Sequence, residues 1–516
     1  MNLVTHLETW AKQCPDALAL CDVHEGQRRS MTFHTLLQRV CGVSRQFRQR
    51  GLEPGQTVFL FYPITIEFYV TLLGALHAGL VVMLADPSAG RAFIAHCCAR
   101  KKVDAFVGIR KAHALRLLVP ALRRVTYAFH EGGYLPFSDV LKKEHDHQPA
   151  YECADDHPAL ITFTSGSTGV PKAAVRTHGF LLAQHRSLSQ ALRLQQGEVD
   201  LVTLPVFCLA NLASGLCSVL ADMNFAHPAQ ADAEKIARQC EDHGVTRCSA
   251  SPAFFEALLR GRMPSFQSIY TGGAPVFPDL IERLTQALPD AQIVSVYGST
   301  EAEPIAECRD ASLDDLHRAS AQGRGLCAGE VVDDIRCKVM RDAWGEALSP
   351  MQEETFLARE CAPGEAGEIV VSGDHVLKGY LDGLGDHETK FRVGDTIWHR
   401  TGDAGYLDEN GRLWLLGRCS EKMQLTNGSV LYPFSLECVI RHRWPQRRAA
   451  VISHRGRHCL IVEKYESMNP AEWQEFATDH HLDDLHWIEK IPLDRRHNAK
   501  VDYTALRAWI ESTNRD

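Results

Sequence analysis

The most informative part of the sequence is Thr162-Phe163-Thr164-Ser165-Gly166-Ser167-Thr168-Gly169-Val170-Pro171-Lys172. Glycines allow backbone N–H groups to approach an anion, hydroxyl groups add hydrogen-bond donors, and the lysine adds a positive charge. The spacing differs from that of a Walker A loop, because Pro171 precedes the lysine and Ala173 follows it. The segment is therefore interpreted as a phosphate loop of another kind, although a surface turn rich in serine and glycine has the same composition.

Length and composition bound the class of protein. The 516 residues are enough for roughly three domains or subdomains, which excludes a small binding module. Charged residues make up 23% and hydrophobic residues 45%, which excludes wholesale disorder and a polytopic membrane protein. The 55 Lys and Arg residues are outnumbered by 64 Asp and Glu residues and form no long run, so we expect no nucleic acid among the partners.

The cysteine pattern indicates a reducing compartment. The chain has 17 cysteines, an odd number, at irregular spacings, and we identify no signal peptide in its first residues. We therefore expect a cytoplasmic protein with reduced thiols, most of them buried as small apolar side chains. The adjacent pair Cys97-Cys98 and the isolated cysteines lack paired C-x-x-C spacing, so a zinc site is not expected.

The apolar segment Val58–Ala85 is long enough to imitate a membrane span. Pro63 and Glu67 interrupt it, and it divides into a strand at Thr57–Tyr62, a helix-like run and a second strand at Val81–Leu84. We interpret it as a buried βαβ unit and predict no membrane span.

The periodicity of the chain predicts an α/β fold. Apolar strand-like runs alternate with helix-length stretches in the first part of the chain, which favours layered α/β subdomains with largely parallel strands. From Gly364 onward, short strands punctuated by Gly and Asp indicate a β subdomain. Strand-like runs return at Ala449–Ser453 and Cys459–Val462. We expect a large N-terminal domain over residues 1–418 and a small α+β C-terminal domain over residues 419–516.

Two further segments suit a nucleotide. Val296-Tyr297-Gly298-Ser299-Thr300-Glu301 supplies an aromatic ring that can stack on a base, a hydroxyl group for an α-phosphate and a carboxylate that can bind Mg²⁺. Arg400-Thr401-Gly402-Asp403 precedes Gly417-Arg418, so a carboxylate for ribose hydroxyls and a guanidinium lie in neighbouring segments. Taken alone, an aspartate such as Asp403 is more often a turn residue.

Together these segments resemble the ordered signature motifs of the adenylate-forming superfamily, which contains acyl-CoA synthetases, peptide-synthetase adenylation domains and luciferases. The resemblance spans Thr162 to Lys500 and includes Gly272-Gly273-Ala274-Pro275 and Gly364–Gly373, followed by Gly379-Tyr380. It implies ATP and Mg²⁺ as cofactors and a small-molecule carboxylic acid as substrate. It also implies a mobile C-terminal domain that rotates about a hinge near Ser420.

The resemblance further implies the roles of individual residues. Thr300 is expected to contact the α-phosphate and Glu301 to bind Mg²⁺. Lys500 is expected to be the mobile lysine that bridges the carboxylate and the α-phosphate. The residues implied to bind ATP are Thr164, Ser165, Gly166, Ser167, Thr168, Gly169, Lys172, Gly273, Ala274, Pro275, Tyr297, Gly298, Ser299, Asp403 and Arg418.

The sequence departs from the superfamily pattern near its C-terminal end. Ser420 stands where Asp or Lys is usual, Lys422–Ser429 is longer than the usual K-x-x-G segment, and Ala499 takes the place of a glycine. The longer segment puts conventional CoA docking in doubt. The ending His497-Asn498-Ala499-Lys500 is similar to that of the olefin-pathway β-lactone synthetases, in which the substrate's own hydroxyl group attacks the adenylate.

The acid pocket, expected at Phe207, Cys208 and Gly272, has an unusual residue. Cys208 replaces the histidine that acyl-CoA synthetases carry and the aspartate that amino-acid activators carry. Without that aspartate an α-ammonium group would be buried unpaired, so amino acids are disfavoured as substrates. An apolar tunnel and an ordinary core are both open interpretations of Phe207, Leu209, Leu212, Phe254, Phe255 and Leu258.

These observations lead to one function and two alternatives. The first is ATP- and Mg²⁺-dependent adenylation of a fatty or other apolar acid, followed by acyl transfer to a thiol, either CoA or the phosphopantetheine of an acyl carrier protein. The second is a β-lactone synthetase acting on a β-hydroxy acid. The third is a non-catalytic nucleotide-binding protein. The sequence leaves the oligomeric state and the chain length of the acid open.

Overall fold

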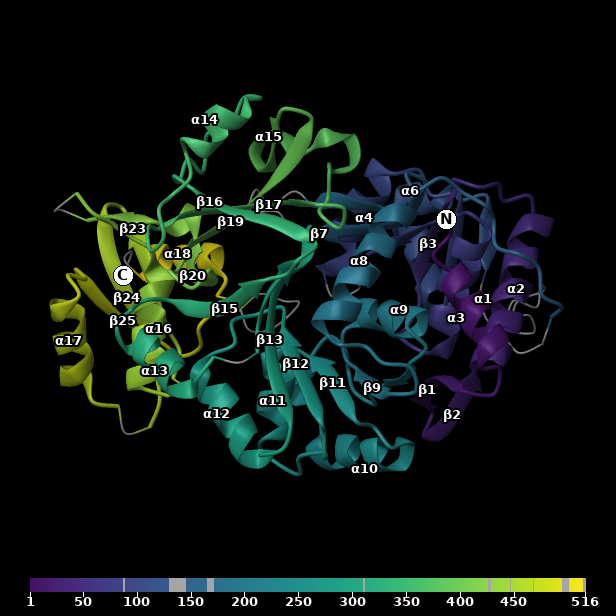
Figure 1. Ribbon diagram of the computed structural model, residues 1–516, viewed down its shortest axis with the longest axis horizontal. Coiled ribbons are helices and arrows are strands. Elements are labelled where there is room, and N and C mark those ends of the chain that lie inside the picture. The colour runs from purple at the N-terminus through teal and green to yellow at the C-terminus, as the bar shows by residue number, and fades with distance from the viewer. Residues whose placement is uncertain are drawn as a thin grey trace.

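Two large β-sheets with helices packed against them make up most of the molecule, and a smaller domain follows at the C-terminal end (Figure 1). The N-terminal part lies at the right of this view and the C-terminal part at the left. The predicted α/β class is confirmed. This computed structural model describes residues 1–86, 89–129, 145–164, 171–309, 311–425, 428–445, 447–466, 468–493 and 501–513.

The first sheet has six strands in the order β6-β5-β3-β4-β7-β8. They run parallel except for β8, which is antiparallel to β7. The strands are β3 (Thr57–Phe61), β4 (Val81–Leu84), β5 (Ala105–Gly108), β6 (Tyr127–Phe129), β7 (Pro158–Thr164) and β8 (Lys172–Thr177). Helix α3 (Ile66–His77) lies between β3 and β4 in the chain, which confirms the predicted βαβ unit. Within the described ranges, no helix is long and apolar enough to cross a bilayer.

The second sheet has 14 strands, and its first part is mostly parallel. The order is β13-β12-β11-β9-β10-β1, and β2 pairs antiparallel with β1 at the edge. These strands are β1 (Leu18–His24), β2 (Gln27–Thr32), β9 (Val199–Val202), β10 (Cys217–Leu220), β11 (Arg247–Ala250), β12 (Ser268–Gly272) and β13 (Gln292–Ser299).

The second part of this sheet is antiparallel and contains the predicted β subdomain. From β13 the order continues through β14, β15, β20, β19 and β17 to β16, and β18 pairs with β19. Main-chain hydrogen bonds therefore join the β subdomain to the parallel strands. Its strands are β14 (Ala302–Cys308), β15 (Leu326–Val331), β16 (Ile335–Met340), β17 (Gly367–Gly373), β18 (Lys390–Val393), β19 (Thr396–Leu407) and β20 (Arg412–Arg418).

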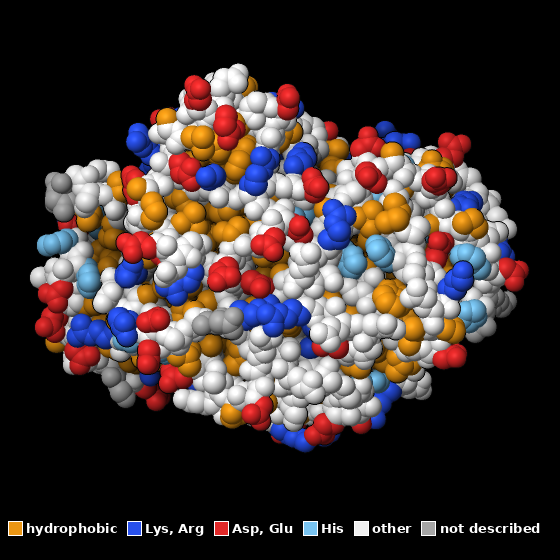
Figure 2. Space-filling model, in the orientation of Figure 1, with side chains coloured by type: hydrophobic (Ala, Val, Ile, Leu, Met, Phe, Trp, Pro, Cys, Tyr) orange, Lys and Arg blue, Asp and Glu red, His pale blue; other side chains and the backbone are white. Residues whose placement is uncertain are grey.

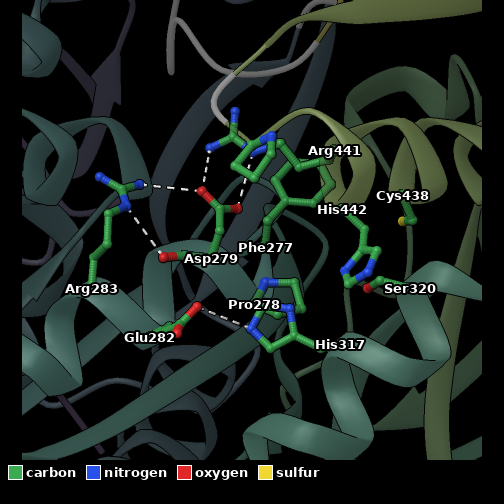
Figure 3. A pocket seen from close by; sticks show the side chains of 11 residues that line it. Phe277, Pro278, Asp279, Glu282, Arg283, His317, Ser320, Cys438, Arg441 and His442 are labelled. Carbon is green, nitrogen blue, oxygen red and sulfur yellow. Dashed lines mark hydrogen bonds and ion pairs between the residues drawn. The ribbon is translucent and has the colours of Figure 1, made fainter. Parts of the chain in front are cut away.

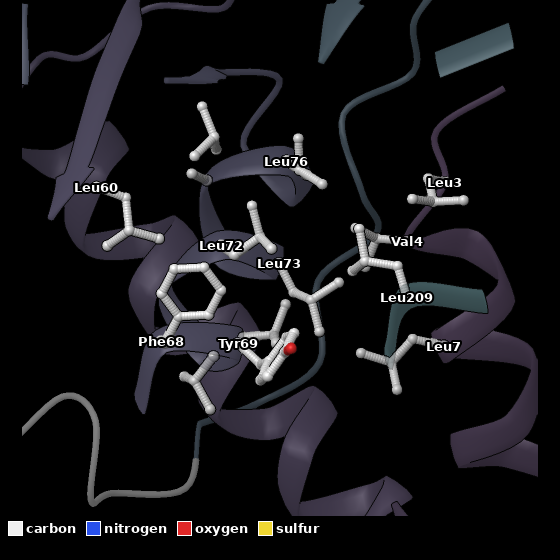
Figure 4. Packing of buried hydrophobic residues seen from close by; sticks show 14 of the residues in the cluster. Leu3, Val4, Leu7, Leu60, Phe68, Tyr69, Leu72, Leu73, Leu76 and Leu209 are labelled. Carbon is white, nitrogen blue, oxygen red and sulfur yellow. The ribbon is translucent and has the colours of Figure 1, made fainter. Parts of the chain in front are cut away.

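Helix α3 lies in the largest cluster of buried apolar side chains (Figure 4). Its leucines pack with Leu3 and Leu7 from the N-terminal segment, with Leu60 of β3, and with Leu209 of a helix that follows β9. All of its residues except Glu67 are buried, so its uniformly apolar composition reflects burial inside the protein. The longer helices around the two sheets are α1 (Thr5–Gln13), α2 (Phe33–Gln49), α4 (Gly90–Arg100), α8 (His178–Ala191), α9 (Pro205–Ala213), α10 (Ala233–His243), α11 (Pro252–Leu258), α12 (Pro278–Ala287) and α13 (Leu313–Ala321).

The described residues after Arg418 form two small sheets. One pairs β21 with β22, and the other has the order β23-β24-β25. The two strands predicted here are found as β23 and β24. The elements are β21 (Met423–Gln424), β22 (Val430–Leu431), α16 (Pro433–Arg443), β23 (Ala449–His454), β24 (Arg457–Glu463), α17 (Pro470–Asp479), β25 (Asp484–Ile488) and α18 (Tyr503–Thr513).

Charged side chains and cysteines differ in where they lie in the structure. Acidic and basic side chains are interspersed over the face that Figure 2 shows. Most of the 17 cysteines are buried, in agreement with their interpretation as small apolar side chains.

Two buried histidines tie the N-terminal segment and α3 to distant parts of the chain. His178 Nδ1 accepts a hydrogen bond from the backbone N–H of Leu3 (3.1 Å). His77 Nδ1 lies 2.9 Å from Ser44 Oγ, and its Nε2 lies 2.9 Å from the carbonyl oxygen of Gln148. Burial is the main cause that lowers the pKa of each imidazole to about 4.

Acid should therefore destabilise the fold. Because the folded-state pKa values are depressed, the stabilisation is fully present above about pH 6.5 and is lost as the pH falls towards 4. At pH 5 we expect each of the two histidines to reduce the free energy of unfolding by about 2 kcal/mol. Urea unfolding at pH 7.5 and 5.0 measures the difference. His178→Gln should weaken the pH dependence, whereas His387→Gln, at an exposed position, should not; equal pH dependence in all three proteins would contradict the assignment.

Candidate active site

The predicted phosphate loop connects two paired strands. Thr164 at the end of β7 lies opposite Lys172 at the start of β8, so the connection leaves and enters the sheet at one place. Lys172 is buried. The side chain of Thr164 and the predicted phosphate ligands Ser165, Gly166, Ser167, Thr168 and Gly169 lie outside the described residues.

A buried arginine joins this strand pair to the second predicted segment. Arg176 of β8 donates one hydrogen bond to Thr162 Oγ1 (2.6 Å) and another to the carbonyl oxygen of Thr300 (2.7 Å). Arg176 is only 6% exposed. The phosphate-loop strands and the Thr300-Glu301 turn are thus held together, although they are far apart in the sequence.

Tyr380 brings a third segment to the same place. Its hydroxyl group donates to Glu301 Oε1 (2.7 Å), and the ammonium group of Lys172 lies 5.6 Å from the centre of its ring. Within the described part of the chain, Glu301 Oε2 has no hydrogen-bond donor. One carboxylate oxygen is therefore available to a hard cation, and Glu301 fits the role of a Mg²⁺ ligand that the sequence predicts.

The predicted ribose residues are in contact with each other and with the predicted adenine residue. Asp403 Oδ1 accepts from Arg418 Nη1 (2.9 Å), and Asp403 Oδ2 accepts from the hydroxyl group of Tyr297 (2.7 Å). Burial, together with the Asp403 carboxylate, raises the pKa of Tyr297 well above its usual value, so this residue stays a hydrogen-bond donor. Asp403 thus contacts both Tyr297 and Arg418.

The glycine-rich loop after β12 borders the same region. Gly272 lies opposite Val296 in the sheet, and a Cβ at position 272 would lie 2.4 Å from the carbonyl oxygen of Val296. Gly273 has φ +77°, which favours glycine, and Ala274 and Pro275 follow it half-buried. In the segment opposite, Gly298 is similarly confined, and Ser299 Oγ is buried without a hydrogen-bond partner among the described residues. Such an orphaned hydroxyl is suited to donate to a bound ligand.

A buried ion pair supports the strand that carries Asp403. Arg400 donates to both carboxylate oxygens of Glu368 (2.6–3.1 Å) and to the carbonyl oxygen of Glu346 (2.6 Å). Arg400 is 1% exposed and Glu368 is 2% exposed. Burial raises the pKa of Glu368, while the guanidinium opposes this shift.

Two residues that the sequence did not single out as ligands belong to this region. Lys390 lies opposite His399 in the β18–β19 pair, and its Nζ lies 2.9 Å from His399 Nδ1 and 5.3 Å from the centre of the Tyr380 ring. Burial is the main cause that lowers the pKa of Lys390 to about 7, and burial also lowers the pKa of His399 well below its usual value. A lysine in a short strand carries no motif, so only the strand pairing reveals it.

The residues considered for the acid pocket lie in separate apolar clusters. Phe207 packs with Tyr270 and Val294, beside the partly buried Val296. Cys208 is fully buried with α3 in the main core. The other apolar candidates also belong to different clusters, because α9 and α11 pack against different parts of the fold. Leu209 and Leu212 belong to the main core, whereas Phe254, Phe255 and Leu258 belong to a third cluster, so the six residues do not line one tunnel.

A pocket with charged walls lies between α12 and α13 of the N-terminal part and α16 of the C-terminal part (Figure 3). Arg441 forms two hydrogen bonds with the Asp279 carboxylate (3.0 and 2.9 Å), and Arg283 forms two with Glu256 (2.9 and 2.7 Å). The lining contains none of the predicted nucleotide ligands. This pocket therefore belongs to the contact between the two parts.

The predicted hinge residue lies just beyond the last strand of the β subdomain. Ser420 is exposed and is the second residue after β20. Two residues further on, Lys422 forms an ion pair with Asp342 (3.2 Å), which also accepts from the hydroxyl group of Tyr432 (2.9 Å). Lys500 lies outside the described residues.

A second cluster of metal-binding side chains lies in the C-terminal domain. Single ligand atoms of Cys459, Asp484 and His486 are within 4.8 Å of one another. However, Arg457 contacts both Asp484 oxygens at 2.6 Å, so this carboxylate is already neutralised. The cluster is therefore better explained as an ion pair at a sheet edge.

Comparison with known proteins agrees with the resemblance. The family described as AMP-binding enzyme matches residues 7–381. The olefin beta-lactone synthetases of Stenotrophomonas maltophilia and Xanthomonas campestris are each 30% identical to this chain, over 99% and 98% of it and over 98% and 97% of their own lengths. A 4-coumarate-CoA ligase of Narcissus pseudonarcissus is 24% identical over 79% of this chain and 74% of its own.

Solved structures show the same fold. ATP-bound MatB from Rhodopseudomonas palustris superposes with a TM-score of 0.79 over 99% of each chain, at 20% identity.

Loss of the Arg400 guanidinium should destabilise the protein strongly. Arg400→Met leaves the buried Glu368 carboxyl group without its partner, and we expect a loss of about 3–5 kcal/mol in the free energy of unfolding. Lys338→Met, which breaks the partly exposed pair with Glu360 on the same sheet, is the matched control and should cost less than about 1 kcal/mol. Urea denaturation measures both. Similar losses for the two variants would show that the buried pair does not support the β subdomain.

Proposed function

Because the chain belongs to the AMP-binding enzyme family, we propose that it activates a β-hydroxy carboxylic acid as an acyl adenylate and closes that adenylate to a β-lactone. The observation that carries the choice of product is the end-to-end similarity to two olefin beta-lactone synthetases. The chain is thus an adenylating enzyme, and the non-catalytic alternative is set aside.

The first half-reaction joins two anions. A carboxylate oxygen of the acid attacks the α-phosphorus of ATP, the new C–O–P linkage forms, and the bond to the pyrophosphate oxygen breaks. The positive charge of Lys172 and the N–H and hydroxyl donors of residues 164–169 and Thr300 lower the cost of bringing the anions together. Lys500 is proposed to bridge the carboxylate and the α-phosphate. Mg²⁺ at Glu301 would offset the negative charge of the phosphates.

The nucleoside is proposed to lie along Tyr297, Asp403 and Arg418. The Tyr297 hydroxyl group is fixed by Asp403, which holds the orientation of the ring against which adenine can stack. The Asp403 carboxylate is the acceptor for the ribose hydroxyls. Gly272 and Gly273 keep the loop after β12 close to β13, and the backbone there can border the base.

The second half-reaction needs no external acceptor. The β-hydroxyl oxygen attacks the carbonyl carbon of the acyl adenylate, a four-membered ring ester forms, the bond to the AMP oxygen breaks, and the hydroxyl proton is released to a base. Two features support this step. The resemblance implies that Lys422–Ser429 is longer than the segment at which CoA ligases bind CoA. In addition, Lys422 forms an ion pair with Asp342 in this conformation.

An acid–thiol ligase is the second candidate. It is supported by the similarity to a 4-coumarate-CoA ligase over most of the chain. In that case CoA or the phosphopantetheine of a carrier protein accepts the acyl group, and a fatty or other apolar acid replaces the β-hydroxy acid.

Adenylation should be detectable without any thiol. We expect exchange of labelled pyrophosphate into ATP in the presence of Mg²⁺ and a β-hydroxy acid, because formation of an acyl adenylate is reversible. The panel should include short, medium and long fatty acids, β-hydroxy acids, aromatic acids and amino acids. Absence of exchange across this panel, from folded protein that binds ATP, would contradict the proposal.

The acceptor separates the two candidates. With a β-hydroxy acid that supports exchange, net AMP release without CoA and a β-lactone in the product mixture are expected. The same acid lacking the hydroxyl group should give exchange but little net AMP release. If AMP release instead requires CoA or a phosphopantetheine carrier, the thiol ligase is correct.

Lys500 should act on the chemical step. Lys500→Ala is expected to slow adenylation by orders of magnitude and leave ATP binding nearly unchanged, since this lysine stabilises the transition state more than bound ATP. Lys490→Ala, which removes another exposed lysine of the C-terminal domain, is the control and should retain activity. Exchange rates and calorimetric ATP affinities measure the two effects, and a collapse of ATP affinity in Lys500→Ala would show that the role is wrong.

A further inference from the structure

We propose that Lys390 and Lys172 together form a site for the β- and γ-phosphates of the nucleotide and for the pyrophosphate that leaves, with Tyr380 between them. The inference deepens the proposed adenylating function. Lys390 is outside every signature motif of the sequence, so the site is assigned from its position in the fold.

The two lysines converge from different sheets. Lys172 opens β8 in the six-stranded sheet, and Lys390 opens β18 in the β subdomain. Their ammonium groups lie 5.6 Å and 5.3 Å from the centre of the same Tyr380 ring. Because Lys172 directly follows the phosphate loop, a second cation on this ring is close to where the terminal phosphates are expected.

His399 fixes the position of Lys390. The register of β18 and β19 places the two residues opposite each other, and the distance between Lys390 Nζ and His399 Nδ1 is 2.9 Å. His399 is 3% exposed, so its ring has little freedom to move. In the tautomer whose Nδ1 carries no proton, the imidazole accepts a hydrogen bond from the ammonium group, which orients that group without neutralising its charge. Nδ1 also lies 3.1 Å from the carbonyl oxygen of Thr389.

The balance of charge around Tyr380 favours an anion. Within the described ranges neither Lys172 nor Lys390 forms an ion pair with a carboxylate. Two carboxylates face the group. The first, Glu301, accepts from the Tyr380 hydroxyl group, and the second, Asp386, accepts from the Tyr380 backbone N–H (2.8 Å). Burial without a direct counter-ion disfavours the charged form of Lys390, and a bound polyphosphate would favour it.

The packing leaves room for this arrangement. Gly385 has φ +101°, and a Cβ there would lie 2.7 Å from both Cδ and Cε of Lys172. The positive φ favours glycine at position 385, and a Cβ there would push the end of the Lys172 side chain aside. Another lysine nearby, Lys378, is exposed and donates to the carbonyl oxygen of Gly373 (2.6 Å), so it does not take part.

The test compares ligands that differ only in their terminal phosphates. Calorimetry with the full chain and Mg²⁺ would measure the affinities for ATP, pyrophosphate and AMP. We expect Lys390→Met to weaken ATP and pyrophosphate binding about tenfold or more, the effect of losing a charge-assisted hydrogen bond, and to change AMP binding less than about twofold. Lys390→Arg should recover most of the loss, and Lys378→Met should leave all three affinities unchanged.

The outcomes are distinct. Equal weakening of all three ligands in Lys390→Met would mean that the residue only supports the fold, and unchanged ATP and pyrophosphate affinities would exclude a phosphate contact. Either result overturns the proposal. If Lys390→Met does not fold, Lys390→Gln, which keeps a donor for His399, is measured with the same expectation. Nucleotide binding does not require the carboxylic acid substrate. If Lys390→Met weakens ATP and pyrophosphate binding but not AMP binding, while the wild-type protein adenylates no carboxylic acid, the proposed function is refuted and the phosphate site is retained.

Discussion

The buried guanidinium of Arg176 joins the two large sheets at the place where the candidate active site lies. It binds Thr162 of the six-stranded sheet and the carbonyl oxygen of Thr300 beyond β13 of the 14-stranded sheet. Nη1 and Nη2 of this buried arginine are satisfied by one partner on each side, so separating the two sheets here would leave one of these donors without its acceptor. The positions of strands β7 and β8 relative to Thr300 and Glu301 depend on this contact.

In the β subdomain, a buried ion pair also supports the strand that carries site residues. Arg400 and Glu368 neutralise each other inside the subdomain, and β19 then carries Asp403 to Arg418 and Tyr297. Tyr380 and Lys390 reach the opposite side of the site from the same subdomain. Polar side chains that are buried and paired in this way have little conformational freedom. Their hydrogen-bond donors are therefore already oriented before a charged nucleotide binds.

The C-terminal domain is held to the N-terminal part by partly exposed ion pairs and by the apolar packing of Tyr432 with Leu316 and Trp414. Arg441 on α16 meets Asp279 and Glu256 of the N-terminal part, and Lys422 meets Asp342. Partly exposed ion pairs contribute little net free energy each, because water competes for the same groups. The domain motion that the superfamily resemblance implies would have to break these ion pairs and the packing of Tyr432.

Local sequence determined the strands and the motif residues. The βαβ unit of α3, strand β17 and strands β23 and β24 lie where apolar periodicity and glycine signals predict them, because these signals act over a few residues. Tertiary structure decided which distant side chains meet. Arg176 became the link between sheets, Lys390 was brought to Tyr380, and Phe254 was separated from Phe207 into another core. These outcomes depend on which strands pair and which face of a helix is covered, and no short segment of sequence carries that information.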